Sequence, residues 1–299
     1  MLNLTVAGML LAALVPQRAD FQTDTTFAVP AGTRLSLQSL RGDVVVHTWD
    51  RNQVRVQADH SSRTKIGVDL SGAVLRLAPR DRDGMGMGSM VDYELTVPAA
   101  MGIEISGMGG DVTIEGSRAD VKVNTVEGDI VLKGGGGDIS LVTVNGGIRV
   151  EGTRGGRLEL QAVSDDIEVT DVQGDVSAQT VSGDLHLRGV DGRRVEAQTV
   201  SGDVTFDGAI RPDGSYSLST HSGDVTMAIP EGASAMIRTA IANGDLSASF
   251  TLPTSERASR TRQAFRLGAG GASIELETFS GDISLVRPGA IRSRNDKED

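Results

Sequence analysis

The sequence predicts an all-β protein, a single-stranded β-solenoid in which each coil has about 18 to 19 residues and contributes two short strands. The first observation behind this fold class is a recurring tetrapeptide of the Ser-Gly-Asp-Val type. Its third position advances in steps of 18, 19, 18, 19, 21, 21 and 37 residues, through Asp129, Gly147, Asp166, Asp184, Asp203, Asp224, Asp245 and Asp282. A near-constant period of this length is typical of repeat proteins whose units stack on one another.

The second observation is a weaker series that runs half a period out of step and divides each repeat into two similar halves. Its members are Asp120, Asp138, Arg157, Asp175 and Arg194. The third observation is strict alternation of apolar and polar residues after each aspartate, as in Ile130-Val131-Leu132 and Ile167-Glu168-Val169. Alternation at period two indicates a strand with one buried and one exposed face. Together the two series predict two strands and two corners per coil, with no helix.

The second strand of each repeat is longer and ends at a threonine, as in Val176-Ser177-Ala178-Gln179-Thr180. Equivalent threonines are expected to stack near one corner, where each hydroxyl can bond a neighbouring backbone group. They are Thr125, Thr143, Thr180, Thr199, Thr220 and Thr278. The glycine that follows in most repeats can adopt the positive φ that a sharp corner often requires.

Four segments are expected along the chain. Residues 1–19 are interpreted as a secretory signal peptide, because Leu2 to Val15 are apolar and a polar segment follows; a buried first strand is the alternative. Residues 20–106 show strand patterns without the period and are predicted to form an irregular β cap. The repeats of residues 107–286 continue from this cap. Residues 287–299 are mostly polar and are predicted to be a disordered tail.

The composition fits a solenoid and disfavours several kinds of partner. The chain of 299 residues has 38 glycines and 3% aromatic residues, which fits many corners and a thin aliphatic core. Its formal net charge of -11 and the absence of a Lys/Arg stripe along the repeats argue against nucleic acid. There is no cysteine, hence no disulfide framework and no thiolate metal site. No later apolar run reaches the 18 or so residues of a spanning helix, so no membrane span is expected after signal cleavage.

The repeated Thr-Val-Ser-Gly-Asp-Val units resemble the bacterial "putative adhesin" family of unknown function. Two further stretches share that family's habits: Gly42 to Asp50, ahead of Val54-Arg55-Val56, and Gly268 to Thr278, ahead of the final repeat. The resemblance covers about Phe27 to Val286. It implies a β-strand-repeat solenoid of the cell envelope and carries over no catalytic residues.

The aspartate column is the main candidate for a chemical role. Its members Asp129, Asp166, Asp184, Asp203, Asp224, Asp245 and Asp282 are interpreted as a structural turn ladder in which each carboxylate accepts hydrogen bonds from backbone N–H groups of its own turn. The alternative is calcium bound between coils, since Gly134 to Leu141 has a passing likeness to a calcium-binding solenoid unit. The ladder interpretation predicts no metal site.

A basic cluster, Arg257, Arg260, Arg262 and Arg266, stands out in this acidic chain. It is either a solvated loop or a docking loop for an anionic polymer or partner. No catalytic residue and no cofactor is predicted, because the sequence has no nucleophile elbow, phosphate loop or His-Glu-x-x-His motif, and few aromatic platforms for sugars.

The predicted function is therefore non-enzymatic. A secreted module of the periplasm or cell surface would present the flat solenoid faces to an envelope protein or glycan, through outward residues such as Arg149, Glu168, His186 and Glu196. Three alternatives remain open: an envelope-stress protein that senses a ligand, a calcium-stabilised solenoid, and a β-helix enzyme acting on polysaccharide.

Overall fold

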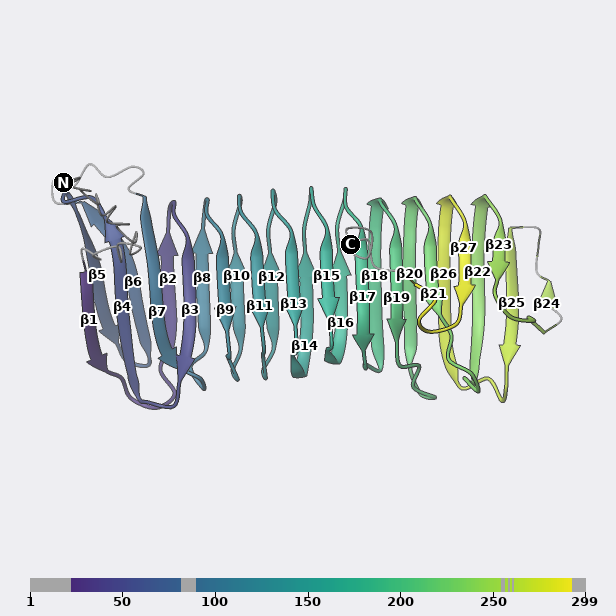
Figure 1. Cartoon of the computed structure of the whole chain (residues 1–299), viewed down its shortest axis with the longest axis horizontal. Coiled ribbons are helices and arrows are strands. Elements are labelled where there is room, and N and C mark those ends of the chain that lie inside the picture. The colour runs from purple at the N-terminus through teal and green to yellow at the C-terminus, as the bar shows by residue number, and fades with distance from the viewer. Residues whose placement is uncertain (1–22, 82–89, 254–255, 258, 260, 292–299) are drawn as a thin grey trace, which may run out of the picture.

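The repeats wind into a straight rod of two parallel sheets that face each other (Figure 1). This computed structural model describes residues 23–81, 90–253, 256–257, 259 and 261–291. Its strands form sheet A, with 13 strands, and sheet B, with 14 strands, and the described residues contain no helix. The solenoid predicted from the period is confirmed. The predicted signal peptide lies outside the described residues and stays a prediction.

The central coils alternate between the two sheets, one strand in each. Sheet B receives β8 (Ile103–Gly107), β10 (Val121–Asn124), β12 (Ile139–Val142), β14 (Arg154–Gln161), β16 (Gln173–Gln179), β18 (Arg194–Ser201) and β20 (Ser215–Ser222). Sheet A receives β9 (Val112–Glu115), β11 (Ile130–Lys133), β13 (Ile148–Glu151), β15 (Ile167–Thr170), β17 (Leu185–Val190), β19 (Val204–Gly208) and β21 (Val225–Ala228). Neighbouring strands are parallel throughout this stretch.

The register places equivalent residues of successive repeats side by side. Ile148 pairs with Ile130 on one side and with Ile167 on the other. In sheet B, Val176 pairs with Leu158 and with Val195 in the same way. A one-residue slip would turn every buried side chain outward, so the alternating pattern itself maintains this register.

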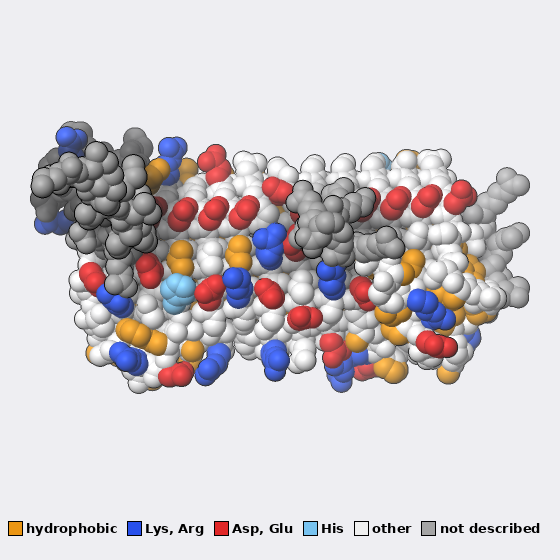
Figure 2. All heavy atoms as spheres, viewed as in Figure 1, with side chains coloured by type: hydrophobic (Ala, Val, Ile, Leu, Met, Phe, Trp, Pro, Cys, Tyr) orange, Lys and Arg blue, Asp and Glu red, His pale blue; other side chains and the backbone are white. Residues whose placement is uncertain are grey.

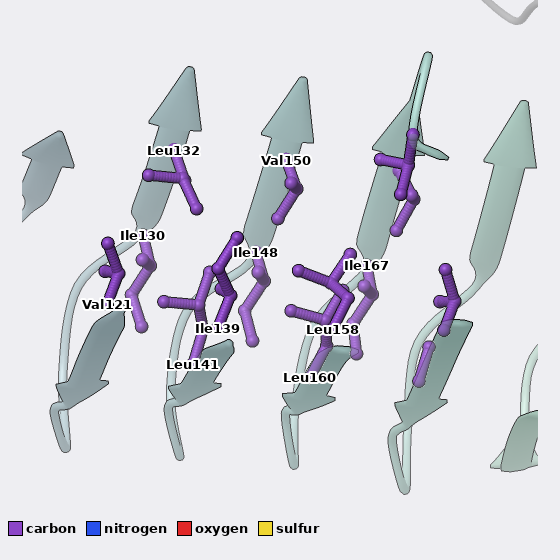
Figure 3. Packing of buried hydrophobic residues seen from close by; sticks show 14 of the residues in the cluster. Val121, Ile130, Leu132, Ile139, Leu141, Ile148, Val150, Leu158, Leu160 and Ile167 are labelled. Carbon is purple, nitrogen blue, oxygen red and sulfur yellow. The ribbon is translucent and has the colours of Figure 1, made fainter. Parts of the chain in front are cut away.

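The core is a thin aliphatic layer between the sheets. Ile130, Leu132, Leu141, Ile167 and Leu160 are all fully buried, and Figure 3 shows such side chains projecting from both sheets into the same interior. The outward residue between each inward pair is exposed or half-buried, as His186 is between Leu185 and Leu187. Large aromatic residues enter this layer toward the C-terminal half, where the rings of Phe206 and Tyr216 lie 5.6 Å apart.

The N-terminal cap contains two coils that are out of chain order. The coil of β2 (Arg34–Ser39) and β3 (Val44–Trp49) lies beside β8 and β9, while that of β6 (Val74–Asp81) and β7 (Val91–Pro98) lies outside it. Antiparallel strands close the end: β4 (Gln53–His60) pairs with β7, β1 (Thr23–Ala28) with β4, and β5 (Thr64–Ser71) with β6. These strands occupy the edges at which another chain could otherwise pair.

The C-terminal end is also out of chain order, which corrects the simple reading of the aspartate series. The coil of β26 (Ala272–Ser280) and β27 (Ile283–Val286) inserts between β20–β21 and the coil of β22 (Ala235–Asn243) and β23 (Leu246–Ala248). Asp282 therefore neighbours Asp224, and Asp245 is outermost. The 37-residue step accommodates β24 (Glu256–Arg257) and β25 (Arg262–Leu267), which cover the edge of sheet B in antiparallel fashion.

The segment expected to be a disordered tail begins with a contact to the rod. Arg287 donates to the carbonyl of Ile229 at 3.0 Å, and its guanidinium lies 4.2 Å from the centre of the Phe250 ring. Residues 292–299 lie outside the described residues.

Candidate interaction surface

One corner of the rod carries a line of carboxylates that joins successive coils. Figure 2 shows a row of acidic side chains along the long axis of the rod. Asp203 accepts a hydrogen bond on Oδ1 from the backbone N–H of Asp224 at 2.8 Å, and Asp224 accepts one from Asp282 at 2.8 Å. The same bond links the pairs Asp43–Asp111, Asp111–Asp129, Asp129–Gly147, Asp166–Asp184, Asp184–Asp203 and Asp282–Asp245. We call this series the acid ladder.

The acid ladder corrects the sequence-based expectation about which N–H groups the carboxylates bind. The donor was expected in the same turn, whereas it is the equivalent residue of the next coil, 2.7 to 3.0 Å away. Each N–H at this corner lies beyond the regular strand, so the carboxylate supplies the acceptor that a strand neighbour would otherwise provide. The ladder also extends through Asp43 to Asp92 in the N-terminal cap. Gly-Asp pairs at Asp43 and Asp111 were the sequence signal for this extension.

Gly147 interrupts the ladder, and a neighbouring residue replaces the missing acceptor. Because Gly147 has no carboxylate, the N–H of Asp166 is bonded instead by Oδ1 of Asp165, its own neighbour, at 2.9 Å. Asp165 stands where most repeats have glycine. The interruption leaves a hollow of about 140 Å³, which Asp129, Gly147, Arg149 and Glu168 help to line.

A row of exposed apolar side chains runs beside the acid ladder at the tip of the same corner. Each member follows the buried threonine position, as Val181 follows Thr180 and Val200 follows Thr199. We call this row the apolar ridge; its members are between 38% and 59% exposed and comprise Leu40, Met108, Val126, Val144, Val163, Val181, Val200 and Phe279. His221 occupies the equivalent place in its coil and stacks on Phe279 at 4.7 Å.

The threonines beneath the ridge hold the corner in place. The hydroxyl of Thr199 donates to the carbonyl of Gly183 at 3.0 Å, and that of Thr220 donates to Gly202 at 2.9 Å. Thr143, Thr180 and Thr278 make the same kind of bond to the preceding coil. The inward threonine and the outward valine therefore have different roles: the first joins coils, and the second faces solvent.

A family model described as Toastrack DUF4097 matches residues 32–286. The chain belongs to this family. The match covers most of the chain and confirms the resemblance inferred from the Thr-Val-Ser-Gly-Asp-Val units. Search of the curated proteins finds no match.

Two solved structures are similar to this Toastrack domain. One is described as a putative cell adhesion protein from Clostridium sporogenes ATCC 15579, with 12% identity, 89% of this chain and 100% of that chain covered, and a TM-score of 0.24. The other is described as a putative adhesin from Bacteroides fragilis NCTC 9343, with 12% identity, 88% and 96% covered, and a TM-score of 0.42.

The second corner of the Toastrack domain has a mixed charge. Asp120 accepts from the N–H of Asp138, and Asp138 accepts from that of Arg157, both at 3.0 Å. Asp175 accepts from the N–H groups of Arg193 and Arg194. At this corner, as in the acid ladder, a carboxylate accepts a hydrogen bond from a backbone N–H of the next coil. Arginines, Arg157 and Arg194, replace the aspartate in two of these coils.

The flat faces carry scattered ion pairs. Arg149 donates to Glu168 at 2.7 Å, which lowers the pKa of the Glu168 carboxyl below its usual value, and Lys133 contacts Glu115 at 3.2 Å. In the predicted docking loop, Arg262 and Arg266 are exposed on β25. The side chain of Arg257 and the whole of Arg260 lie outside the described residues, and the docking loop stays a prediction.

Within the described ranges, no three His, Asp or Glu side chains come together as metal ligands would. There is also no helix in those ranges with the length and apolarity to cross a bilayer.

We expect the acid ladder to stabilise the rod through hydrogen bonds. Asp203→Ala removes the acceptor for the N–H of Asp224 and should lower the free energy of unfolding by about 0.5 to 2 kcal/mol. Asp203→Asn keeps an Oδ1 acceptor and should cost less than about 0.5 kcal/mol. Urea denaturation of both variants measures the difference. A fall in Tm on adding a chelator, reversed by calcium, would instead support the calcium alternative.

Gly147 and Asp165 allow a test of whether a carboxylate at one position can replace the hydrogen-bond acceptor lost at the other. Asp165→Ala should destabilise the rod by about 0.5 to 2 kcal/mol, because the N–H of Asp166 loses its acceptor. Adding Gly147→Asp restores both the net charge and a carboxylate in the ladder, and should recover most of that loss. A Cβ on Gly147 would lie 3.2 Å from the carbonyl oxygen of Asp166, so a small shift suffices. Equal stability of the single and double variants in a denaturant titration contradicts this assignment.

Proposed function

We propose that this Toastrack domain is a secreted, non-enzymatic interaction module of the bacterial envelope. It would bind a protein or glycan partner along the side of its rod, with the apolar ridge as the main contact. The apolar stretch from Leu2 to Val15 supports export, and the repeat family supports an adhesin-like role.

The observation that carries this proposal is the continuity of the apolar ridge. Isolated exposed apolar residues are ordinary on protein surfaces, whereas contiguous ones mark interaction sites. Val126, Val144, Val163, Val181 and Val200 come from five successive coils and are each at least 38% exposed. Parallel pairing holds these coils in register. The ridge is therefore a preformed linear surface, and a partner would not bear the cost of ordering it.

Beside the ridge, sheet B is hollowed. Gln179, Gln198, Ser219 and Glu277 help to line a shallow depression of about 520 Å³ whose other side is formed by Val200, His221 and Phe279. Apolar side chains next to amide and hydroxyl groups form the mixed surface typical of reversible protein or glycan contacts.

The proposal is tested by capture from an envelope extract. The chain from residue 20 onward is immobilised as wild type, as Val181→Ser/Val200→Ser, and as the matched control Ser177→Ala/Ser217→Ala on the face of sheet B. Wild type and control should retain the same envelope component, and the ridge variant should lose it. Because both valines are nearly half exposed, the ridge variant should keep the wild-type Tm. Retention of the same component by all three would contradict the proposal.

A further inference from the structure

We propose that the apolar ridge and the acid ladder together bind a cationic amphipathic helix of a partner protein. This inference rests on the proposed function and specifies its partner. Apolar side chains of the helix would contact the ridge, and its Lys or Arg side chains would pair with the ladder carboxylates.

The two rows lie on one corner, and in the coils of Val181, Val200 and Phe279 only a serine and a glycine separate them. In one coil the order is Val181, Ser182, Gly183, Asp184, and in the next it is Val200, Ser201, Gly202, Asp203. Ser182 and Ser201 are exposed and both glycines are half-buried. A helix about 10 Å across could therefore contact both rows without meeting a bulky side chain between them.

Three neighbouring ladder residues, Asp203, Asp224 and Asp282, face solvent. The hydrogen bond to the next coil occupies Oδ1 of Asp203, Asp224 and Asp282, and all three residues are exposed. Asp184, one coil earlier, has its Oδ2 4.0 Å from His186 Nε2. Arg149 is near Asp129 but directs its guanidinium to Glu168. A row of like charges at coil spacing on an acidic chain favours a cationic partner.

The spacing of the rows favours a helix over an extended strand. Successive ridge residues repeat with the coils, about 4.8 Å apart. A helix presents one side chain of a given face about every 5.4 Å, whereas a strand presents one about every 6.8 Å. The helix therefore stays nearly in step over about three or four turns, and flexible Lys side chains can absorb the remaining offset.

The same charges argue against a second copy of this chain as the occupant. The formal net charge is -11, and each copy would bring its own acid ladder to the contact. Two such ladders repel one another unless they are kept apart, and that repulsion is strongest at low salt.

A synthetic peptide tests the inference directly. The probe is a fluorescein-labelled helix of 14 residues, built from Leu and Lys with leucines at i, i+3, i+4 and i+7; at about 21 Å it spans about four coils. Controls are a peptide of the same composition in a non-amphipathic order and a Leu/Glu peptide. Fluorescence anisotropy at 50 mM and 300 mM salt measures binding to the chain from residue 20 onward.

The expected result is binding of the amphipathic Leu/Lys peptide alone, weakened several-fold at high salt. Val181→Ser/Val200→Ser should weaken it at least tenfold. Asp203→Asn/Asp224→Asn, which keeps an acceptor for each N–H, should weaken it at least fivefold. The matched control Glu159→Gln/Glu196→Gln removes the same charge from sheet B and should bind within twofold of wild type.

Three outcomes would overturn the inference. They are equal binding by the ladder variant and its matched control, equal binding of the reordered peptide, and a ridge-dependent dimer of wild type in analytical ultracentrifugation. If ridge-dependent capture from extract persists while the peptide fails, the proposed function stands and the cationic helix is excluded. If capture does not depend on the ridge, the proposed function itself fails.

Discussion

Phe206→Ala is expected to lower the free energy of unfolding by about 3 to 5 kcal/mol. Phe206 is fully buried in β19, pairs with Leu187 and Met227 of the adjacent strands, and packs its ring against Tyr216. The core is only one layer thick between two sheets, so few groups can move in to fill the cavity. The control is Thr205→Ala, one residue earlier and pointing outward, which should cost less than about 0.5 kcal/mol.

Chemical denaturation of both variants measures the contrast. Equal shifts of the unfolding midpoint would show that the inward and outward faces of β19 are wrongly assigned. A change in the denaturant slope for Phe206→Ala alone would indicate that the coils near the aromatic pair unfold separately, as can happen in repeat proteins.

Gly223→Ala is expected to destabilise the rod by about 2 to 5 kcal/mol, through a backbone effect at the corner. Gly223 has a φ of +148°, which side chains rarely adopt, and an added Cβ would press into the carbonyl oxygen of Gly202 in the preceding coil. That oxygen belongs to the backbone and already accepts from Thr220, so the coils must separate to relieve the contact.

A second glycine separates the cost of a positive φ from the cost of a steric clash with the neighbouring coil. Gly232 also has a positive φ, +77°, but an added Cβ there would meet nothing within 4 Å. Gly232→Ala should therefore cost about 1 kcal/mol, since only the backbone preference is lost. Thermal unfolding of the two variants gives the comparison, and similar Tm values would mean that close coil contact at the corner does not limit the choice of residue.

The regular part of the fold could be predicted because the same alternation of apolar and polar residues recurs in every coil. The pattern of Ile167-Glu168-Val169 and its equivalents identifies the buried face of each strand, and the constant period places equivalents side by side. The threonine and aspartate columns followed from the same alignment. The order of the terminal coils could not be predicted, because β22 and β26 have equally regular strand patterns. Only the strand pairing in the structure shows that β26 lies next to β20 and that β22 lies outside it.

The candidate surface was predicted only in part. The aspartates were recognised, but the N–H group that donates to each ladder carboxylate belongs to the neighbouring coil, which lies 18 or more residues away in the chain, and a local turn was the simpler assumption. Asp165 supplies the acceptor that Gly147 lacks, and this could not be predicted because the two residues belong to adjacent coils and neither substitution alone indicates a hydrogen bond. The apolar ridge was not assigned a role, because Val181 and Val200 fit the strand pattern until their exposure is known.

The insertion of β26–β27 between two coils that precede it in the chain has a mechanical consequence. In an ordinary solenoid the last coil has one neighbour and a loose end, so it unravels first. Here the outermost coil, β22–β23, is not the last one in the chain: the last coil, β26–β27, lies inside it, and β27 has β21 on one side and β23 on the other. Force on the C-terminus would load a strand flanked by neighbours instead of peeling an edge. If the rod binds a partner along its side, it could therefore bear tension at its C-terminal end without the coils unfolding one after another.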